Sequence, residues 1–152
     1  MSLIRWMSVS MVISFSMACG GGGISAPPVG FTHAFATRTC GPADGPAVAI
    51  YLSPDPVTDL EPATPYVRVY VAESVNALAG RTWILAGSKS AGGAWFHSAA
   101  SNYEIATGGY MMVSSVRSDN TIEGKVNITF PNAGRIRGGF RAAWIPSTVL
   151  CG

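Results

Sequence analysis

Residues 122–144 read IEGKVNITF, then PNAG, then RIRGGFRAAW, and this stretch decides the fold class. In both longer runs an apolar residue or a glycine occupies every second position, which is the period of a β-strand with one buried face. The PNAG segment favours a turn of about four residues, because proline, asparagine and glycine adopt turn conformations readily. The stretch therefore predicts an antiparallel β-hairpin. Its register is well specified, because a slip of one residue would bury three arginines.

The two faces of this predicted hairpin differ in chemistry. The apolar face belongs to the core and comprises Ile122, Val126, Ile128, Phe130, Ile136, Phe140, Ala142 and Trp144. The opposite face carries Lys125, Arg135, Arg137 and Arg141. Such cations suit the phosphates of lipids and lipopolysaccharides or the carboxylates of acidic glycans. The alternative is that they form only the solvated face of an antiparallel sheet and keep it from pairing with other sheets.

Composition extends this pattern to the whole chain. The 152 residues suit one domain, and 18 glycines and 10 prolines leave little room for helices. Further strands are expected at 31–39, 47–52, 66–73, 81–86, 94–99, 103–105 and 110–116. Their spacing and turn residues predict an all-β fold, an antiparallel β-sandwich or small β-barrel of about eight strands over residues 31–152. We expect strand 31–39 at an edge, and strands 81–86 and 94–99 as partners.

Residues 1–18 are expected to be an export signal. Arg5 supplies a positive start, and residues 6–17 form an apolar run that is too short to span a bilayer. The run ends in SMAC at 16–19, followed by four glycines. This leader resembles those of bacterial lipoproteins, in which a small residue precedes a cysteine that is lipidated. The resemblance covers about the first 25 residues.

The resemblance implies that a lipidated Cys19 is the mature N-terminus, that residues 19–30 form a glycine- and proline-rich tether, and that a membrane is the partner. The expected location is the bacterial cell envelope, either periplasmic or surface-exposed. Ser16 and Met17 depart from the usual lipoprotein motif, and Ser16 with Ala18 also fits ordinary signal-peptidase cleavage. Secretion without an anchor is therefore the alternative.

Cysteine usage agrees with export. If Cys19 carries a lipid, Cys40 and Cys151 remain as a pair, and an oxidising compartment would let them form a disulfide that brackets the domain. The alternative is two independent buried thiols. No Cys-x-x-Cys spacing occurs and only two histidines are present, so we expect neither a metal nor a cofactor.

Motifs for catalysis are missing from the sequence. It has no Gly-x-Ser-x-Gly motif, and His33 and His97 lie far apart. Ser88-Lys89-Ser90 lies in a glycine-rich turn and suits a solvated loop better than a Ser–Lys dyad. The spacing of the acidic cluster does not match a calcium-binding loop; the cluster comprises Asp55, Asp59 and Glu61. We therefore expect no catalytic residues and no enzymatic activity.

The sequence thus favours a non-catalytic binding or structural module of the envelope, with a glycan, a lipid or another envelope protein as its partner. A net charge of +2 excludes a general nucleic-acid binder. One alternative is a carbohydrate-binding module with outward rings at Tyr66, Tyr70 and Tyr110. The tryptophans of the apolar runs are expected in the core instead: Trp83, Trp95 and Trp144. The other alternative is a secreted enzyme inhibitor or a small hydrolase.

Overall fold

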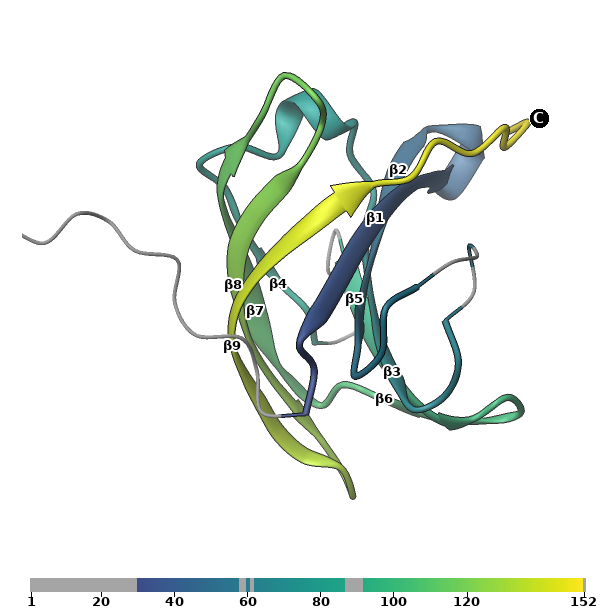
Figure 1. The fold of residues 1–152 in the computed structure, drawn as a ribbon, viewed down its shortest axis with the longest axis vertical. Coiled ribbons are helices and arrows are strands. Elements are labelled where there is room, and N and C mark those ends of the chain that lie inside the picture. The colour runs from purple at the N-terminus through teal and green to yellow at the C-terminus, as the bar shows by residue number, and fades with distance from the viewer. Residues whose placement is uncertain (1–29, 58–59, 61, 87–91, 152) are drawn as a thin grey trace, which may run out of the picture.

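The computed structural model describes residues 30–57, 60, 62–86 and 92–151, and this part of the chain is almost entirely β-structure (Figure 1). The expected all-β fold is therefore confirmed. Two single-turn 3₁₀ helices, η1 (Pro42–Asp44) and η2 (Val75–Ala77), accompany nine strands. The strands are β1 (His33–Cys40), β2 (Pro46–Ser53), β3 (Tyr66–Val71), β4 (Thr82–Ile84), β5 (Gly92–Ala99), β6 (Asn102–Ile105), β7 (Gly108–Val116), β8 (Ile122–Phe130) and β9 (Gly134–Trp144).

Several sequence predictions concern residues outside this part of the chain. The export signal at 1–18, the tether up to residue 29 and the serine–lysine segment at 88–90 belong to that group, as do Asp59 and Glu61. Within the described ranges, no helix is long and apolar enough to cross a membrane.

The nine strands form one sheet in the order β4-β7-β8-β9-β1-β2-β3-β5-β6. This sheet curls into a half-barrel rather than separating into two stacked layers (Figure 1). Neighbouring strands pair antiparallel except β1 and β9, which run parallel. Curling lets one sheet bury its own apolar face, so the domain needs no second layer.

Two details of the predicted arrangement are wrong. β1 lies in the middle of the sheet between β9 and β2, not at an edge. β4 pairs with β7 and β5 pairs with β3, so the strands predicted at 81–86 and 94–99 are not partners. The number of paired residues explains why β5 pairs with β3 instead of β4. The pairing of β3 with β5 runs from Tyr66↔His97 to Val71↔Gly92, whereas β4 has only three residues.

The hairpin predicted at 122–144 is present as β8 and β9. Its register runs from Ile122↔Ala142 to Phe130↔Gly134, which leaves a turn at residues 131–133. Gly134 follows the turn with φ of +74°, a conformation that glycine adopts without steric cost. The predicted apolar face is buried except at Trp144, which packs against the core while staying partly exposed.

The core fills the concave side of the half-barrel. Alternate residues of β2 and β3 point into it and are at most 1% exposed: Val48, Ile50, Leu52, Val67, Val69 and Val71. Trp83 of β4 and Met111 of β7 contribute from the other half of the sheet. On the other face, Tyr51 of β2 and the outward residues of β3 are partly exposed, whereas Ala47, Ala49 and Ser53 of β2 are buried.

The C-terminal end of the chain is fastened to β1. The two strands β1 and β9 share only two paired positions, the second of which is Ala36↔Trp144. Beyond β9, the Ile145 N–H donates a hydrogen bond to the Ala36 carbonyl at 2.8 Å. The Thr37 hydroxyl in turn donates to the Ile145 carbonyl at 2.8 Å. This seam continues the parallel pairing after β9 has ended.

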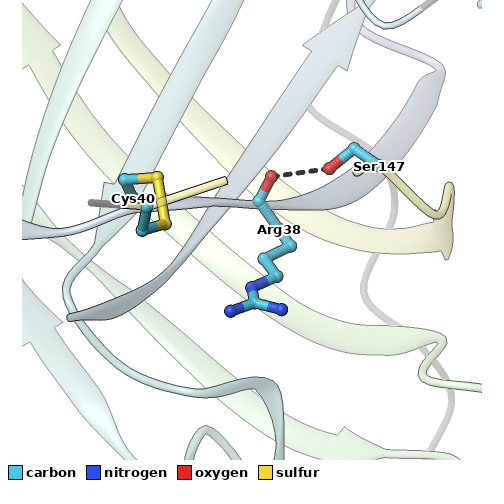
Figure 2. Close-up of a disulfide and its surroundings, with 4 residues drawn as sticks. Arg38, Cys40 and Ser147 are labelled. Carbon is cyan, nitrogen blue, oxygen red and sulfur yellow. Dashed lines mark hydrogen bonds between the residues drawn. A yellow bond between two sulfur atoms is a disulfide. The ribbon is translucent and has the colours of Figure 1, made fainter. Parts of the chain in front are cut away.

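A disulfide completes the seam (Figure 2). The Ser147 hydroxyl donates to the Arg38 carbonyl at 2.9 Å, and Cys151 is bonded to Cys40 just beyond it. The predicted pairing of Cys40 with Cys151 is confirmed, and the alternative of two independent thiols is excluded. The bond joins the end of β1 to the end of the chain.

Removing this disulfide with Cys40→Ser and Cys151→Ser together is expected to lower the free energy of unfolding by about 4–5 kcal/mol. The reason is that the bond spans 111 residues and restricts the unfolded chain. Equilibrium unfolding in urea measures the loss, and Cys19→Ser serves as the control that leaves stability unchanged. A loss below about 1 kcal/mol in the double variant would show that the seam holds without its cross-link.

Candidate functional site

The predicted basic face is present on the outside of β8 and β9, but its cations do not form one cluster. Each cation lies opposite a residue that is not a cation: Thr129↔Arg135, Asn127↔Arg137, Lys125↔Gly139 and Glu123↔Arg141. The Arg135 Nε also donates to Asn127 Oδ1 at 2.7 Å, which draws its guanidinium over β8. The four cations therefore alternate with neutral and acidic groups.

Glu123 neutralises one end of this face. Its Oε1 lies 2.8 Å from Arg117 Nη2 and 3.5 Å from Arg141 Nε. Lys125 and Arg137 form no ion pair with any described residue. Of the four cations, only Arg141 is ion-paired among the described residues, and Arg135 is hydrogen-bonded to the neutral Asn127. An anionic ligand for this face remains a prediction.

A second set of outward side chains crosses the other half of the sheet, and the sequence analysis predicted only two of them, Tyr66 and Tyr70. Cross-strand pairing aligns one row over five strands: Phe35, Tyr51, Arg68, Trp95 and Ile105. The rings of Phe35 and Tyr51 are stacked, with centroids 4.5 Å apart. Directly opposed residues of one sheet face share the same side, so these side chains all lie on the outer face. Phe35 is buried there, Tyr51, Arg68 and Trp95 are partly exposed, and Ile105 is exposed.

A neighbouring row widens this surface. The Tyr66 and His97 rings stack with centroids 4.4 Å apart, and Tyr103 lies 5.6 Å from His97. Tyr51 connects the two rows, because its ring lies 5.9 Å from that of Tyr66. We call the whole set the aromatic face; it comprises Phe35, Tyr51, Tyr66, Arg68, Tyr70, Trp95, His97 and Tyr103.

Arg68 lies at the centre of the aromatic face. Its guanidinium carbon is 6.0 Å from the Tyr51 ring centroid and 5.8 Å from that of Trp95, the geometry of cation–π contacts. The Nε atom is buried and has no hydrogen-bond acceptor among the described residues, and no carboxylate there pairs with the guanidinium. A buried donor left without an acceptor costs about 1–3 kcal/mol. Arg68 as a whole is partly exposed, so a ligand can reach its side chain.

The prediction that Trp95 belongs to the core is wrong. Ala94 and Phe96 point inward on β5, which leaves Trp95 outward and only partly buried. Gly93 makes room for the indole, because a Cβ at that position would lie 2.7 Å from the Trp95 ring. The edge of the indole meets Tyr70 at a centroid distance of 6.4 Å. The glycine two residues before the tryptophan was the sequence signal for this placement.

The predicted outward tyrosines divide between the two halves of the sheet. Tyr66 and Tyr70 belong to the aromatic face, whereas Tyr110 lies on β7 opposite Ile84 and Asn127. Burial raises the pKa of the Tyr70 phenol, and the positive charge of Arg68 partly offsets that rise. The phenol therefore stays protonated at neutral pH and can donate a hydrogen bond. Of the other tryptophans, Trp83 is in the core as predicted.

A pocket of about 540 Å³ opens at the end of the half-barrel where β8 turns into β9. Phe31 and Phe96 meet edge to face inside it, with centroids 6.5 Å apart. The residues that line it are mostly apolar, with two arginines: Gly30, Phe31, Pro65, Phe96, Ala133, Arg135, Ile136 and Arg137. Its size falls within the range of ligand-binding pockets.

Residues suited to metal binding or catalysis are dispersed. His33 is exposed at the start of β1, whereas His97 lies in the aromatic face three strands away. Asp55 is exposed in the loop after β2. No group of three histidine, cysteine, aspartate or glutamate side chains within the described ranges could hold a metal ion.

Comparison of the chain with protein-family models, curated proteins and solved structures finds no match.

Glu104 fixes the turn that borders the pocket. Its Oε2 accepts hydrogen bonds from the backbone N–H of Asn132 at 2.8 Å and of Ala133 at 3.2 Å. The Asn132 N–H in particular holds the pKa of Glu104 below its ordinary value of 4.5. Because the pKa is lower in the folded chain, the stabilisation is complete above pH 4.5 and is lost as the pH falls through the folded value.

The variant Glu104→Gln is accordingly expected to be less stable than the wild type at pH 7. The difference between the two proteins should shrink as the pH is lowered below 4.5, because the wild-type carboxylate then becomes protonated. Urea unfolding of both proteins from pH 7 down to pH 3 measures this. A stability difference that does not change with pH would rule out the carboxylate as the anchor of the turn.

Proposed function

We propose that the chain is a non-catalytic binding module of the bacterial cell envelope, exported and anchored through a lipidated Cys19, and that it binds an acidic glycan on its aromatic face. One observation supports an acidic glycan as the ligand. Arg68 presents a guanidinium in the middle of a row of aromatic rings, and no carboxylate of the described residues pairs with it.

The rings of the aromatic face suit sugars. A pyranose has one face made of C–H groups, which packs against a flat aromatic ring, and Tyr and Trp combine a large apolar surface with a polar atom at the rim. Tyr103 is 55% exposed, and Tyr51, Tyr66 and Trp95 are partly exposed, so a ligand can reach them. Neutral sugars would already be able to stack on these rings.

Arg68 adds a preference for acid groups. A guanidinium donates two parallel N–H bonds to a carboxylate, and these charge-assisted bonds are stronger than bonds to the neutral hydroxyls of a sugar. Tyr51 and Trp95 hold the guanidinium from both sides, so little side-chain freedom is lost when a ligand binds. A uronic acid or a sialic acid fits this combination of flat ring and carboxylate.

The spacing of the strands suits an oligosaccharide. Tyr51 and Trp95 lie on strands that flank β3, so about 10 Å separates their backbones. Arg68 lies midway between them. A carboxylate on one sugar could therefore contact Arg68 while adjoining sugars lie against the rings on either side.

Export and anchoring rest on the N-terminal sequence and on the disulfide. The leader ends in SMAC at 16–19 with a glycine-rich segment after it, as in bacterial lipoproteins. The bond between Cys40 and Cys151 is of the kind that persists in an oxidising compartment and leaves Cys19 for the lipid. The tether would then hold the domain close to envelope glycans.

Binding of the full chain to three acidic oligosaccharides tests the ligand class: tetragalacturonate, hyaluronan tetrasaccharide and sialyllactose. At least one is expected to bind, and Arg68→Gln should weaken that binding about tenfold to hundredfold, because hydrogen bonds to a charged group are lost. Calorimetric titration measures the affinities. The control Arg38→Gln removes an exposed arginine outside the aromatic face and should leave binding unchanged.

Methyl-esterified tetragalacturonate gives a second comparison, since it keeps the sugars and lacks the charge. It is expected to bind as weakly to the wild type as the acid binds to Arg68→Gln. Thermal melting of each variant verifies that the fold is intact. Failure of all three acids to bind, or equal affinity for the acid and its ester, would refute the proposed ligand class.

The anchor has its own test. Replacing Cys19 by serine should move the protein from the membrane fraction to the soluble fraction of the cell envelope, because the acylated side chain is lost. Fractionation after an alkaline wash, with intact mass of the wild-type protein, measures this. A Cys19→Ser protein that stays with the membrane, or a wild-type mass without acyl chains, would contradict the anchor.

A further inference from the structure

β9 runs past the beginning of β1. The two strands are parallel with Phe35 opposite Ala143, and β1 starts at His33, so this register places its first residue opposite Arg141. Residues 134–140 of β9 therefore extend beyond β1, and the hairpin β8–β9 projects past the start of β1 in Figure 1. β8 pairs with these residues on one side only.

Within residues 30–57, 60, 62–86 and 92–151, the other side of residues 134–140 is a free strand edge. No further strand in the described part of the chain pairs with it, since the neighbours of β9 in the sheet are β8 and β1. The pocket lies along this edge, because three consecutive residues line it: Arg135, Ile136 and Arg137. Consecutive residues of a strand point to opposite faces, so a cavity that contacts all three lies beside the strand.

The chemistry along this edge alternates. Ile136 points inward and is 8% exposed, whereas Arg135 and Arg137 point outward and are exposed. Phe31 and Phe96 make the inner side of the pocket apolar. The hydrogen bond from Arg135 Nε to Asn127 Oδ1 keeps the Arg135 side chain over β8 and away from the edge.

We propose that an extended peptide adds as a strand to the free edge of β9, with alternate apolar and acidic side chains. Its backbone pairs with residues 134–140, its apolar residues enter the pocket beside Phe31 and Phe96, and its acidic residues face Arg137. Strand addition of this kind takes affinity from backbone hydrogen bonds and specificity from the side-chain pockets. This site lies apart from the aromatic face and does not depend on a glycan ligand.

Two simpler readings fit the edge less well. Charged residues often protect a strand edge from pairing, but a protected edge needs no apolar pocket beside it. An acyl chain would fill the pocket, yet it would form no hydrogen bonds with the backbone N–H and C=O groups of the edge. A peptide satisfies both the apolar walls and the backbone groups.

The peptide acetyl-EVEVEVE-amide, titrated into the full chain, tests the proposal. We expect saturable binding with amide shifts at residues 134–140 in NMR spectra. Methylating the backbone nitrogens of its valines should weaken binding at least about tenfold, because the N–H groups that pair with an edge strand are removed from one side. Methylating the backbone nitrogens of the glutamates instead tests the other side of the peptide. One of the two sets of methyl groups must weaken binding.

Charge reversal gives the matched variants. Arg137→Glu should weaken EVEVEVE binding at least about tenfold and allow KVKVKVK to bind, because opposite charges would again face each other. Arg38→Glu reverses an exposed arginine at the opposite end of β1 and should change neither affinity. Absence of peptide binding, equal effects of the two reversals, or indifference to both sets of backbone methyl groups would overturn the proposal. So would displacement of the peptide from the pocket by dodecanoate at a tenfold lower concentration, which would assign the pocket to an acyl chain.

Discussion

The pairing of β3 with β2 and β5 fixes which side chains meet on each face of the sheet. In this register the valines of β3 face the core, so Arg68 must face outward between Tyr51 and Trp95. A slip of one residue would exchange the two faces and bury the guanidinium against aliphatic side chains, at a cost of several kcal/mol. The core and the aromatic face are thus two results of one pairing.

The seam between β1 and β9 shapes the rest of the molecule. It joins the half of the sheet that ends in β9 to the half that begins with β1, through two paired positions, the hydrogen bonds that follow and the disulfide. Because this junction lies at the C-terminal end of β9, the opposite end of β9 has no second neighbour among the described strands and borders the pocket. The position of the β1–β9 junction thus explains both the closed C-terminal end of β9 and the open edge at its N-terminal end.

Local patterns predicted the local features. Strict alternation and the PNAG turn predict the hairpin at 122–144, and cysteine counting predicts the Cys40–Cys151 bond. Apart from Tyr66 and Tyr70, the aromatic face was missed because its rows depend on register between strands that are distant in sequence, as when Arg68 meets Trp95. The pairing of 81–86 with 94–99 failed for a related reason: closeness in sequence does not decide which strand offers the longer ladder.

The functional account depends on one claim: the charge of Arg68, at the centre of the aromatic face, binds an acidic ligand. The ¹H–¹⁵N signal of Arg68 Nε tests it most directly, because that atom is buried and lacks an acceptor among the described residues. During titration with an acidic oligosaccharide that binds, we predict a saturable downfield shift of this signal, at the same midpoint as calorimetry gives. An unmoved Arg68 signal, with shifts confined to the outer face of β8 and β9, would contradict the account.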